Sequence, residues 1–353
     1  MGRIVVAYQP DSITLAHSLL PLVRGKYRHE FVFARSIKEA LRYTHASAIL
    51  LVRFHKLNRG GFDPIADLLG TLHERFLRVG FFDDSANSAA LAAPFLNDAN
   101  VIYYKKQVLS ERSEYCETKD TATVYRFGSV ACADPDAIRR NTRSSVSVER
   151  IRLSWNLGIG SLPRDKRTKA AIVRLEQLLG PKALRFLYRT SWRRYSGRPN
   201  GDFISARWQS EFGNDTVRMH RQRFFERVQA HAAFRTGRIH QREYNRELKD
   251  AFATLSPFGF GEVCYRDFEA AIFRSCLIKP DMSHVETWPD IYLPHQSYVP
   301  VKWDASDVIE TAEELLRDRP RARRIAENAF DILSDAYNHL DERVEMIVKD
   351  LLG

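Results

Sequence analysis

Residues 251–281, AFATLSPFGFGEVCYRDFEAAIFRSCLIKPD, give the clearest indication of the fold in the sequence. Phe252–Ser256 is short and apolar enough for a buried strand, and a proline and two glycines then end the pattern. From Glu262 onward the apolar residues recur at near-helical spacing, and Cys276–Ile278 is a second apolar run that Pro280 closes. The order strand, glycine loop, helix, strand predicts a βαβ unit.

The two glycines of this loop, Gly259 and Gly261, predict a turn that binds phosphate. Neither residue has a Cβ, so a ligand can approach the main chain closely. The following helix directs its free N–H groups and the positive end of its dipole at the same place. Arg266 can add a charge-assisted contact, and Glu269 can accept hydrogen bonds from sugar hydroxyls. The alternative is that the loop is only a tight turn and Glu269 only a solvated side chain.

This segment resembles the nucleotide-sugar site of GT-B glycosyltransferases, whose donor half carries a Gly-Phe-Gly loop and a helical Glu followed by small residues. The matching positions are Gly259-Phe260-Gly261 and Glu269-Ala270-Ala271. Phe258 stands where the common retaining families carry a Glu, which leaves the stereochemical outcome open. A wider likeness to bacterial surface-polysaccharide glycosyltransferase-like proteins extends over about residues 200–335. The resemblance implies two Rossmann-like, doubly wound α/β domains that face each other across a cleft.

The rest of the chain is consistent with two domains. Its 353 residues suit two domains, and strands alternate with helices through the first half. Two glycines and a proline follow Trp155 with little periodicity, which indicates a hinge. We expect an acceptor-side domain over residues 1–162 and a donor domain over 163–336. We expect the last helix, within 337–353, to pack back on the first domain.

Three further groups of residues are candidates for the site, because they follow predicted strands. Arg207 leaves the strand Asp202–Arg207, where a diphosphate needs a cation. His284 lies in the expected loop Ser283–Pro294 and can contact the donor, although a lone loop histidine is more often incidental. Asp84, with Asp83 as second choice, follows the strand Arg78–Phe82 and can act as general base on an acceptor hydroxyl. The alternative for both acids is a helix cap or a plain loop acid.

The charge and composition of the chain limit the classes of partner that it could bind. Residues 139–246 hold 25 Lys and Arg against 8 Asp and Glu, a surplus of 17. Such a field attracts nucleic acid, anionic lipid or phosphorylated ligands. We find no nucleic-acid-binding motif, which favours a nucleotide-sugar and contact with an anionic membrane over nucleic acid. A surface charge that only aids solubility is the alternative.

Other features point to a cytoplasmic protein, with the inner face of the membrane as a further expected place. No apolar run reaches the roughly 18–20 residues of a membrane span, and the N-terminus is a strand rather than a signal peptide. The four cysteines form no CxxC pair, so neither a zinc site nor a disulfide framework is indicated.

The sequence therefore predicts a metal-independent glycosyltransferase of bacterial surface-polysaccharide synthesis, with a glycan or lipid-linked acceptor. The nucleotide-sugar is a substrate, and no further cofactor is expected. Gly259, Gly261, Arg266 and Arg207 would hold the diphosphate. Two alternatives remain: a GT-B-fold nucleotide-sugar epimerase, and a nonenzymatic protein that binds nucleic acid or anionic membrane through its basic segment.

Overall fold

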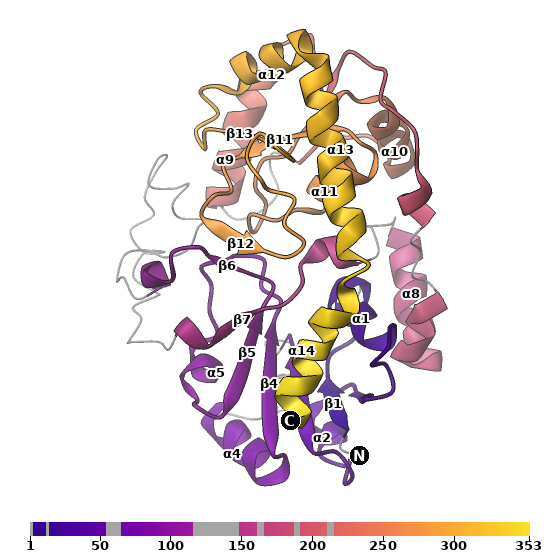
Figure 1. Cartoon of the computed structure of the whole chain (residues 1–353), viewed down its shortest axis with the longest axis vertical. Helices are drawn as coiled ribbons and strands as arrows, with labels where there is room; N and C mark the ends of the chain where they lie inside the picture. The colour runs from indigo at the N-terminus through magenta and orange to yellow at the C-terminus, as the bar shows by residue number, and fades with distance from the viewer. Residues whose placement is uncertain are drawn as a thin grey trace.

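The computed structural model describes residues 3–11, 14–53, 65–115, 148–160, 166–186, 191–209 and 215–353. These residues form two lobes, each built around a parallel sheet (Figure 1). The predicted fold class, two Rossmann-like α/β domains, is confirmed.

The first sheet has the strand order β2-β1-β3-β4-β5-β7, and every neighbouring pair is parallel. Its strands are almost continuously apolar, as expected for strands that helices cover on both faces. They are β1 (Ile4–Ala7), β2 (Phe31–Ala34), β3 (Ala48–Val52), β4 (Arg78–Asp83), β5 (Val101–Lys105) and β7 (Ile151–Leu153).

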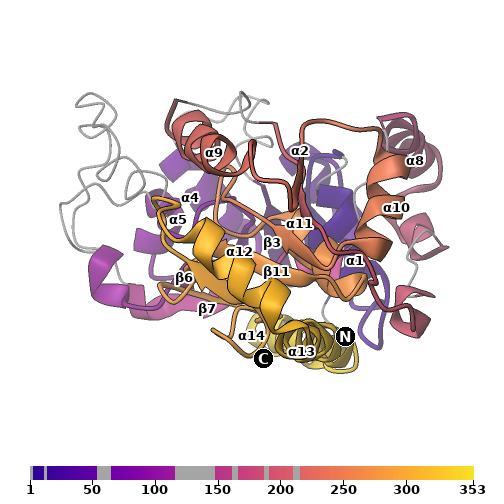
Figure 2. The same ribbon diagram turned by 90° about the horizontal axis from the view of Figure 1, so that it is seen from above.

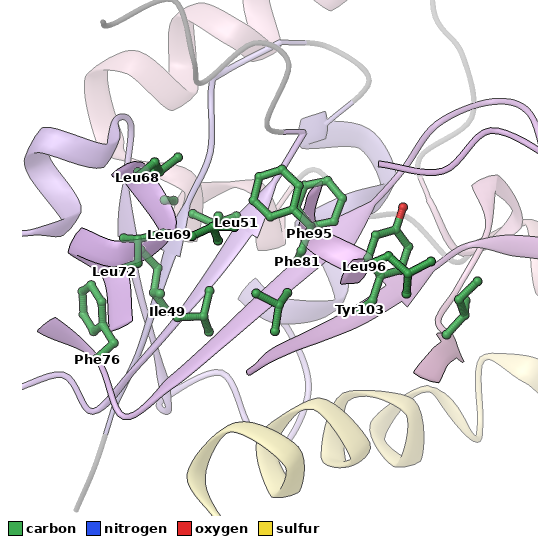
Figure 3. Close-up of a cluster of buried hydrophobic side chains, with 14 of the residues drawn as sticks. Ile49, Leu51, Leu68, Leu69, Leu72, Phe76, Phe81, Phe95, Leu96 and Tyr103 are labelled. Atoms are coloured by element: carbon green, nitrogen blue, oxygen red, sulfur yellow. The ribbon is translucent and has the colours of Figure 1, made fainter. Parts of the chain in front are cut away.

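One face of this sheet is covered by α2 (Ile37–Ala40), α4 (Ile65–Arg75) and α5 (Ala93–Asn97). Figure 3 shows leucines of α4 over Ile49 and Leu51, and the Phe81 ring stacked on Phe95, with centroids 4.2 Å apart. The opposite face is covered by α1 (Leu20–Val23) and by α14 (Leu340–Leu352). Alternate residues of each strand therefore enter separate cores on the two faces.

The second sheet has the order β13-β11-β10-β8-β9 and is also parallel throughout. Its strands are β8 (Ile204–Ala206), β9 (Phe234–Thr236), β10 (Ala253–Leu255), β11 (Cys276–Pro280) and β13 (Val299–Val301). Around it lie α9 (Asp215–Val228), α10 (Gln241–Asp250), α11 (Tyr265–Ile272), α12 (Val308–Arg317) and α13 (Arg319–Ala336). The predicted βαβ unit is thus β10, α11 and β11.

Three connections join the lobes. Helices α13 and α14 follow one another along one side of the molecule, and α14 packs on β1, β3 and β4 (Figures 1 and 2). Strand β6 (Gln107–Leu109) of the first half pairs antiparallel with β12 (Val285–Thr287) of the second. Helix α8 (Lys166–Leu179) lies against the first lobe, where Arg35 Nε contacts Glu176 Oε1 at 3.0 Å. The expected boundary between residues 162 and 163 stays a prediction, and the packing of α8 favours one further along the chain.

Local departures from the sequence predictions have simple causes. The helix expected over Ser12–Val23 is, in its described part, a π-helical turn at Thr14–Ser18 followed by α1, which has Pro21 in its first turn. The loop expected over Ser283–Pro294 contains β12, whose partner strand lies in the other half of the chain. Short 3-10 helices span Arg112–Tyr115, Val148–Arg150, Leu157–Ile159, Pro181–Phe186 and Ser191–Arg194.

Candidate functional site

A cavity of about 450 Å³ lies in the second lobe, at the carboxyl ends of β8, β9 and β10. Ligands of parallel α/β sheets bind at this edge. Five of the residues predicted for the donor line the cavity: Arg207, Gly259, Gly261, Arg266 and Glu269. Ala86 and Leu157 line it from the first half of the chain, so the cavity lies at the junction of the two lobes.

The glycine loop is held from α9. His220 Nε2 accepts a hydrogen bond from the Phe258 main-chain N at 3.2 Å, and Arg221 Nε donates to the Phe258 carbonyl at 3.0 Å. Burial lowers the pKa of His220 to about 3, with neighbouring cations adding to the effect. The ring is therefore neutral at physiological pH, which leaves Nε2 able to accept the hydrogen bond.

The start of α11 is fixed by a buried carboxylate. Asp267 Oδ2 accepts a hydrogen bond from the Cys264 main-chain N at 2.9 Å and contacts Lys279 Nζ at 3.0 Å. Tyr292 OH donates to the same carboxylate at 2.7 Å. These contacts hold the first turn of the helix beside the glycine loop.

Arginines surround the cavity. Arg266 Nε donates to the Arg207 carbonyl at 3.1 Å, and its guanidinium lies 5.9 Å from the Trp208 ring centroid. Arg207 Nη2 pairs with Glu247 Oε2 at 2.6 Å, so this predicted phosphate ligand already has an anionic partner. Arg221 also lines the cavity, and burial lowers its pKa. Arg221 and Arg266 line the cavity beside the glycine loop, so they are candidates for an anionic ligand.

Glu269 lies on the wall of the cavity with 6 % of its surface exposed. Tyr244 on α10 lines the same cavity, and its pKa is raised by burial and by its hydrogen-bonded neighbour Glu269. Tyr265, the first residue of α11, also lines the cavity. Burial raises its pKa, and the negative charges of Asp84 and Glu269 add to the effect.

The two adjacent aspartates point to different environments. Asp83 accepts hydrogen bonds from the Tyr103 hydroxyl at 2.6 Å and from Lys105 Nζ at 3.0 Å. Burial alone would raise the pKa of Asp83, but the charge of Lys105 and the hydrogen bonds outweigh burial, so the net effect lowers this pKa. Asp84 accepts from Ser18 Oγ at 3.2 Å and lies 3.5 Å from Arg53 Nε. Burial raises the pKa of Asp84 against the opposing charges of Arg53 and Lys106. Asp83 is thus engaged in holding its loop, and Asp84 is the better candidate base.

His284 lies behind the glycine loop, outside the set of residues that line the cavity. Its ring packs against Phe258 and Trp303, and its Nε2 is 3.9 Å from Glu262 Oε1. The predicted contact of His284 with the donor therefore has no direct geometric support. Among the described residues, no group of His, Cys, Asp or Glu side chains is arranged to hold a metal ion.

Trp208 and Tyr244 are among the cavity residues that were not predicted from the sequence. Trp208 directly follows Arg207 at the end of β8, and the strand-end rule that selected Arg207 could have found it. Tyr244 carries no local signal, because only the packing of α10 brings it to Glu269. Arg221 lies three residues after Arg218 on α9, a spacing that allows either a phosphate clamp or a plain basic surface, and of the two only Arg221 lines the cavity.

Two parallel sheets, a cavity at the edge where the lobes meet and a C-terminal helix that returns to the first lobe together define the GT-B fold. HepE from Anabaena, in a crystal structure with UDP and glucose, has this fold. The two structures superpose with a TM-score of 0.51 at 8 % sequence identity, over 99 % of this chain and 100 % of HepE.

A glycosyltransferase from Rickettsia africae gives a TM-score of 0.49 at 9 % identity, over 99 % of each chain. No protein-family model and no curated protein sequence matches this chain significantly. The likeness to HepE therefore establishes the fold.

Proposed function

We propose that the protein is a glycosyltransferase that moves a sugar from a nucleotide-sugar to an acceptor held by the first lobe. The observation that carries the proposal is the cavity at the strand ends of the second sheet, bordered by the glycine loop, Arg221, Arg266 and Glu269. The cavity reaches Ala86, two residues after Asp84. A donor in the cavity would therefore face the loop that carries the candidate base.

Each residue has a role that follows from its position. Arg221, Arg266 and the N-terminus of α11 stabilise the charge on the departing diphosphate. Glu269 accepts hydrogen bonds from hydroxyls of the donor. In an inverting reaction, Asp84 takes the proton of the acceptor hydroxyl as that oxygen attacks the anomeric carbon and the bond to the diphosphate breaks. Asp83 positions Asp84 through the main chain.

We propose UDP as the nucleotide part of the donor, because HepE, a protein of the same fold, was crystallised with UDP and glucose. We propose a glycan or lipid-linked acceptor of a bacterial surface polysaccharide from the sequence resemblance over about residues 200–335.

We also propose that the protein contacts the cytoplasmic face of an anionic membrane. None of the described helices is long and apolar enough to cross a membrane. At the end of α8, Leu178 and Leu179 are 74 % and 66 % exposed, and the side chains of Arg174 and Lys182 are exposed beside them. Exposed leucines among cations suit insertion among anionic headgroups.

The membrane contact can be tested with vesicles of phosphatidylglycerol and of phosphatidylcholine. Wild-type protein should sediment with the anionic vesicles, and Leu178→Ser with Leu179→Ser should weaken this binding severalfold. Leu77→Ser is the control. Leu77 is 85 % exposed, so this substitution also removes an exposed leucine, but Leu77 lies between α4 and β4 and not at the end of α8. Equal sedimentation of the double variant and the wild type would contradict the proposed surface.

The catalytic proposal is tested by incubation with UDP-sugars, with and without candidate acceptors. A transferase should need the acceptor to consume the donor, apart from slow hydrolysis. Isomerised sugar without an acceptor would instead identify an epimerase. Steep salt-dependent binding to nucleic acid, without binding of any sugar nucleotide, would identify a nonenzymatic binder.

A further inference from the structure

Glu262 follows the second glycine of the loop and reaches into the first lobe. Its side chain is fully buried. Its carboxylate accepts hydrogen bonds from Ser88 N at 3.1 Å, Ser88 Oγ at 2.6 Å and Gln107 Nε2 at 2.8 Å. We call these contacts the interdomain clasp.

The clasp attaches to the loop that carries the candidate base. Gln107 Nε2 also donates to the Ala86 carbonyl at 2.7 Å, and Ala86 and Ser88 closely follow Asp84 in the chain. The same loop is fixed on its other side, where Ser85 N donates to Asp83 Oδ1 at 2.9 Å and Lys105 Nζ donates to Ser85 Oγ at 2.8 Å. A short rigid path therefore connects the glycine loop to Asp84.

The three hydrogen bonds of the clasp come to Glu262 from neutral donors, and His284 Nε2 lies 3.9 Å from Glu262 Oε1. A carboxylate is costly to bury, and hydrogen bonds of this kind offset the cost without a large net gain in stability. Their geometric effect is larger: an acceptor on one lobe fixes donors on both the 88 loop and β6 of the other lobe. The contacts thus favour a role in placing the two lobes over a role in stability.

We propose that Glu262 is a positioning residue that sets the spacing between the glycine loop and Asp84. The clasp follows from the contacts alone, whereas its effect on catalysis rests on the proposed function. A nucleotide that orders the glycine loop would, through Glu262, also order the loop after Asp84. Donor binding and placement of the base are then coupled.

A second carboxylate across the same interface supplies a matched control. Glu286 on β12 pairs with Arg112 Nη2 at 2.6 Å, but its side chain is 49 % exposed and it does not touch the glycine loop. Exposed ion pairs of this kind contribute little. Glu286→Ala removes a carboxylate at the junction of the lobes without removing the clasp.

Hydrogen exchange of the ligand-free protein, read by mass spectrometry, tests the clasp directly. In Glu262→Ala, the amides of residues 86–89 and 258–263 should exchange faster together, by about tenfold or more. Glu286→Ala should leave both segments unchanged. Glu262→Gln should stay close to the wild type, because its amide oxygen can accept from Ser88 N and Gln107 Nε2 while the Ser88 hydroxyl turns to accept from the amide.

Unchanged exchange in both segments of Glu262→Ala, or equal acceleration in Glu286→Ala, would overturn the clasp. If Glu262→Ala does not fold, Ser88→Ala removes the 2.6 Å contact, keeps the main-chain contact of Ser88 N and should give a smaller increase, about threefold. If the wild type turns over a sugar nucleotide, Glu262→Ala should lower kcat at least about tenfold and Glu262→Gln should restore most of it. Unchanged kcat in Glu262→Ala would overturn the positioning role. A wild type without nucleotide binding would defeat the proposed function, and the exchange measurement would still decide the clasp.

Discussion

Gly261 and Ala86 are in contact across the junction of the two lobes: a Cβ built on Gly261 would come within 1.4 Å of the Ala86 carbonyl oxygen. No side chain fits there unless one main chain moves. The glycine loop is therefore shaped by the other lobe as well as by a ligand, which adds a second physical reason for a glycine at this position.

Gly261→Ala should separate the lobes locally and destabilise the protein by about 1–3 kcal/mol, the usual cost of overpacking. Binding of a sugar nucleotide should weaken with it. The measurement is urea unfolding together with calorimetric titration. Gly70→Ala is the control, since Gly70 lies in α4 with nothing within 4 Å of a built Cβ; it should stabilise the protein by about 0.5–1 kcal/mol. A fully stable Gly261→Ala that binds normally would contradict this account of the junction.

Arg266→Ala should weaken nucleotide binding by about 1.5–3 kcal/mol, or roughly 10- to 150-fold in Kd, because a charge-assisted contact to phosphate is lost. Arg227→Ala is the matched control, because Arg227 is an exposed arginine on α9 away from the cavity. Titration calorimetry at fixed salt distinguishes the two. Equal losses in both variants would mean that only the general positive field matters.

Part of the fold could be predicted from the sequence. It placed the strand, glycine loop and helix correctly, because two glycines, a proline and a change of apolar period all lie within 31 residues. The end of α8 at Leu179 also has a local signal, because Gly180 and Pro181 follow it directly. The sequence missed β6 and β12 because each is short and pairs only with the other, across the two halves of the chain.

Only part of the candidate site could be predicted from the sequence, for the same reason. Gly259, Gly261, Arg266 and Glu269 share one local motif and line one cavity. Glu262 lies within that motif, yet its partners Ser88 and Gln107 are 174 and 155 residues away in the chain, so no spacing rule could indicate its role.

Asp84 and Lys106 predict a specific pH dependence. Because burial raises the pKa of Asp84, the acid limb of the pH–activity profile should lie above the usual range of an aspartate. The positive charge of Lys106 opposes the rise in the pKa of Asp84. Burial lowers the pKa of Lys106 itself to about 8, so Lys106 is still charged in the acidic pH range where Asp84 titrates. Lys106→Met should therefore move the acid limb to higher pH. Asp84→Asn should lower kcat by about 10²–10⁴ and leave donor Kd unchanged. An acid limb that moves to lower pH in Lys106→Met would exclude Asp84 as the titrating base.

His220 should make the fold sensitive to acid. Its folded pKa is about 3, below the value of about 6.5 in unfolded chains, so the unfolded state binds more protons between these values. The stability it contributes is present above pH 6.5 and is lost as pH falls toward 3, at up to about 1.4 kcal/mol per pH unit. His220→Gln keeps an acceptor for Phe258 N but cannot titrate, so its unfolding free energy should fall less steeply. His339→Gln, at an exposed histidine, should keep the wild-type slope.

We propose that a sugar nucleotide occupies the cavity between the glycine loop, Arg266 and Glu269. The most direct measurement is titration calorimetry of the wild type, Arg266→Ala and Glu269→Ala with a panel of sugar nucleotides, UDP-sugars first. The wild type should bind at least one member, and both variants should bind it at least about tenfold more weakly. No binding to any member, or undiminished binding in both variants, would contradict it.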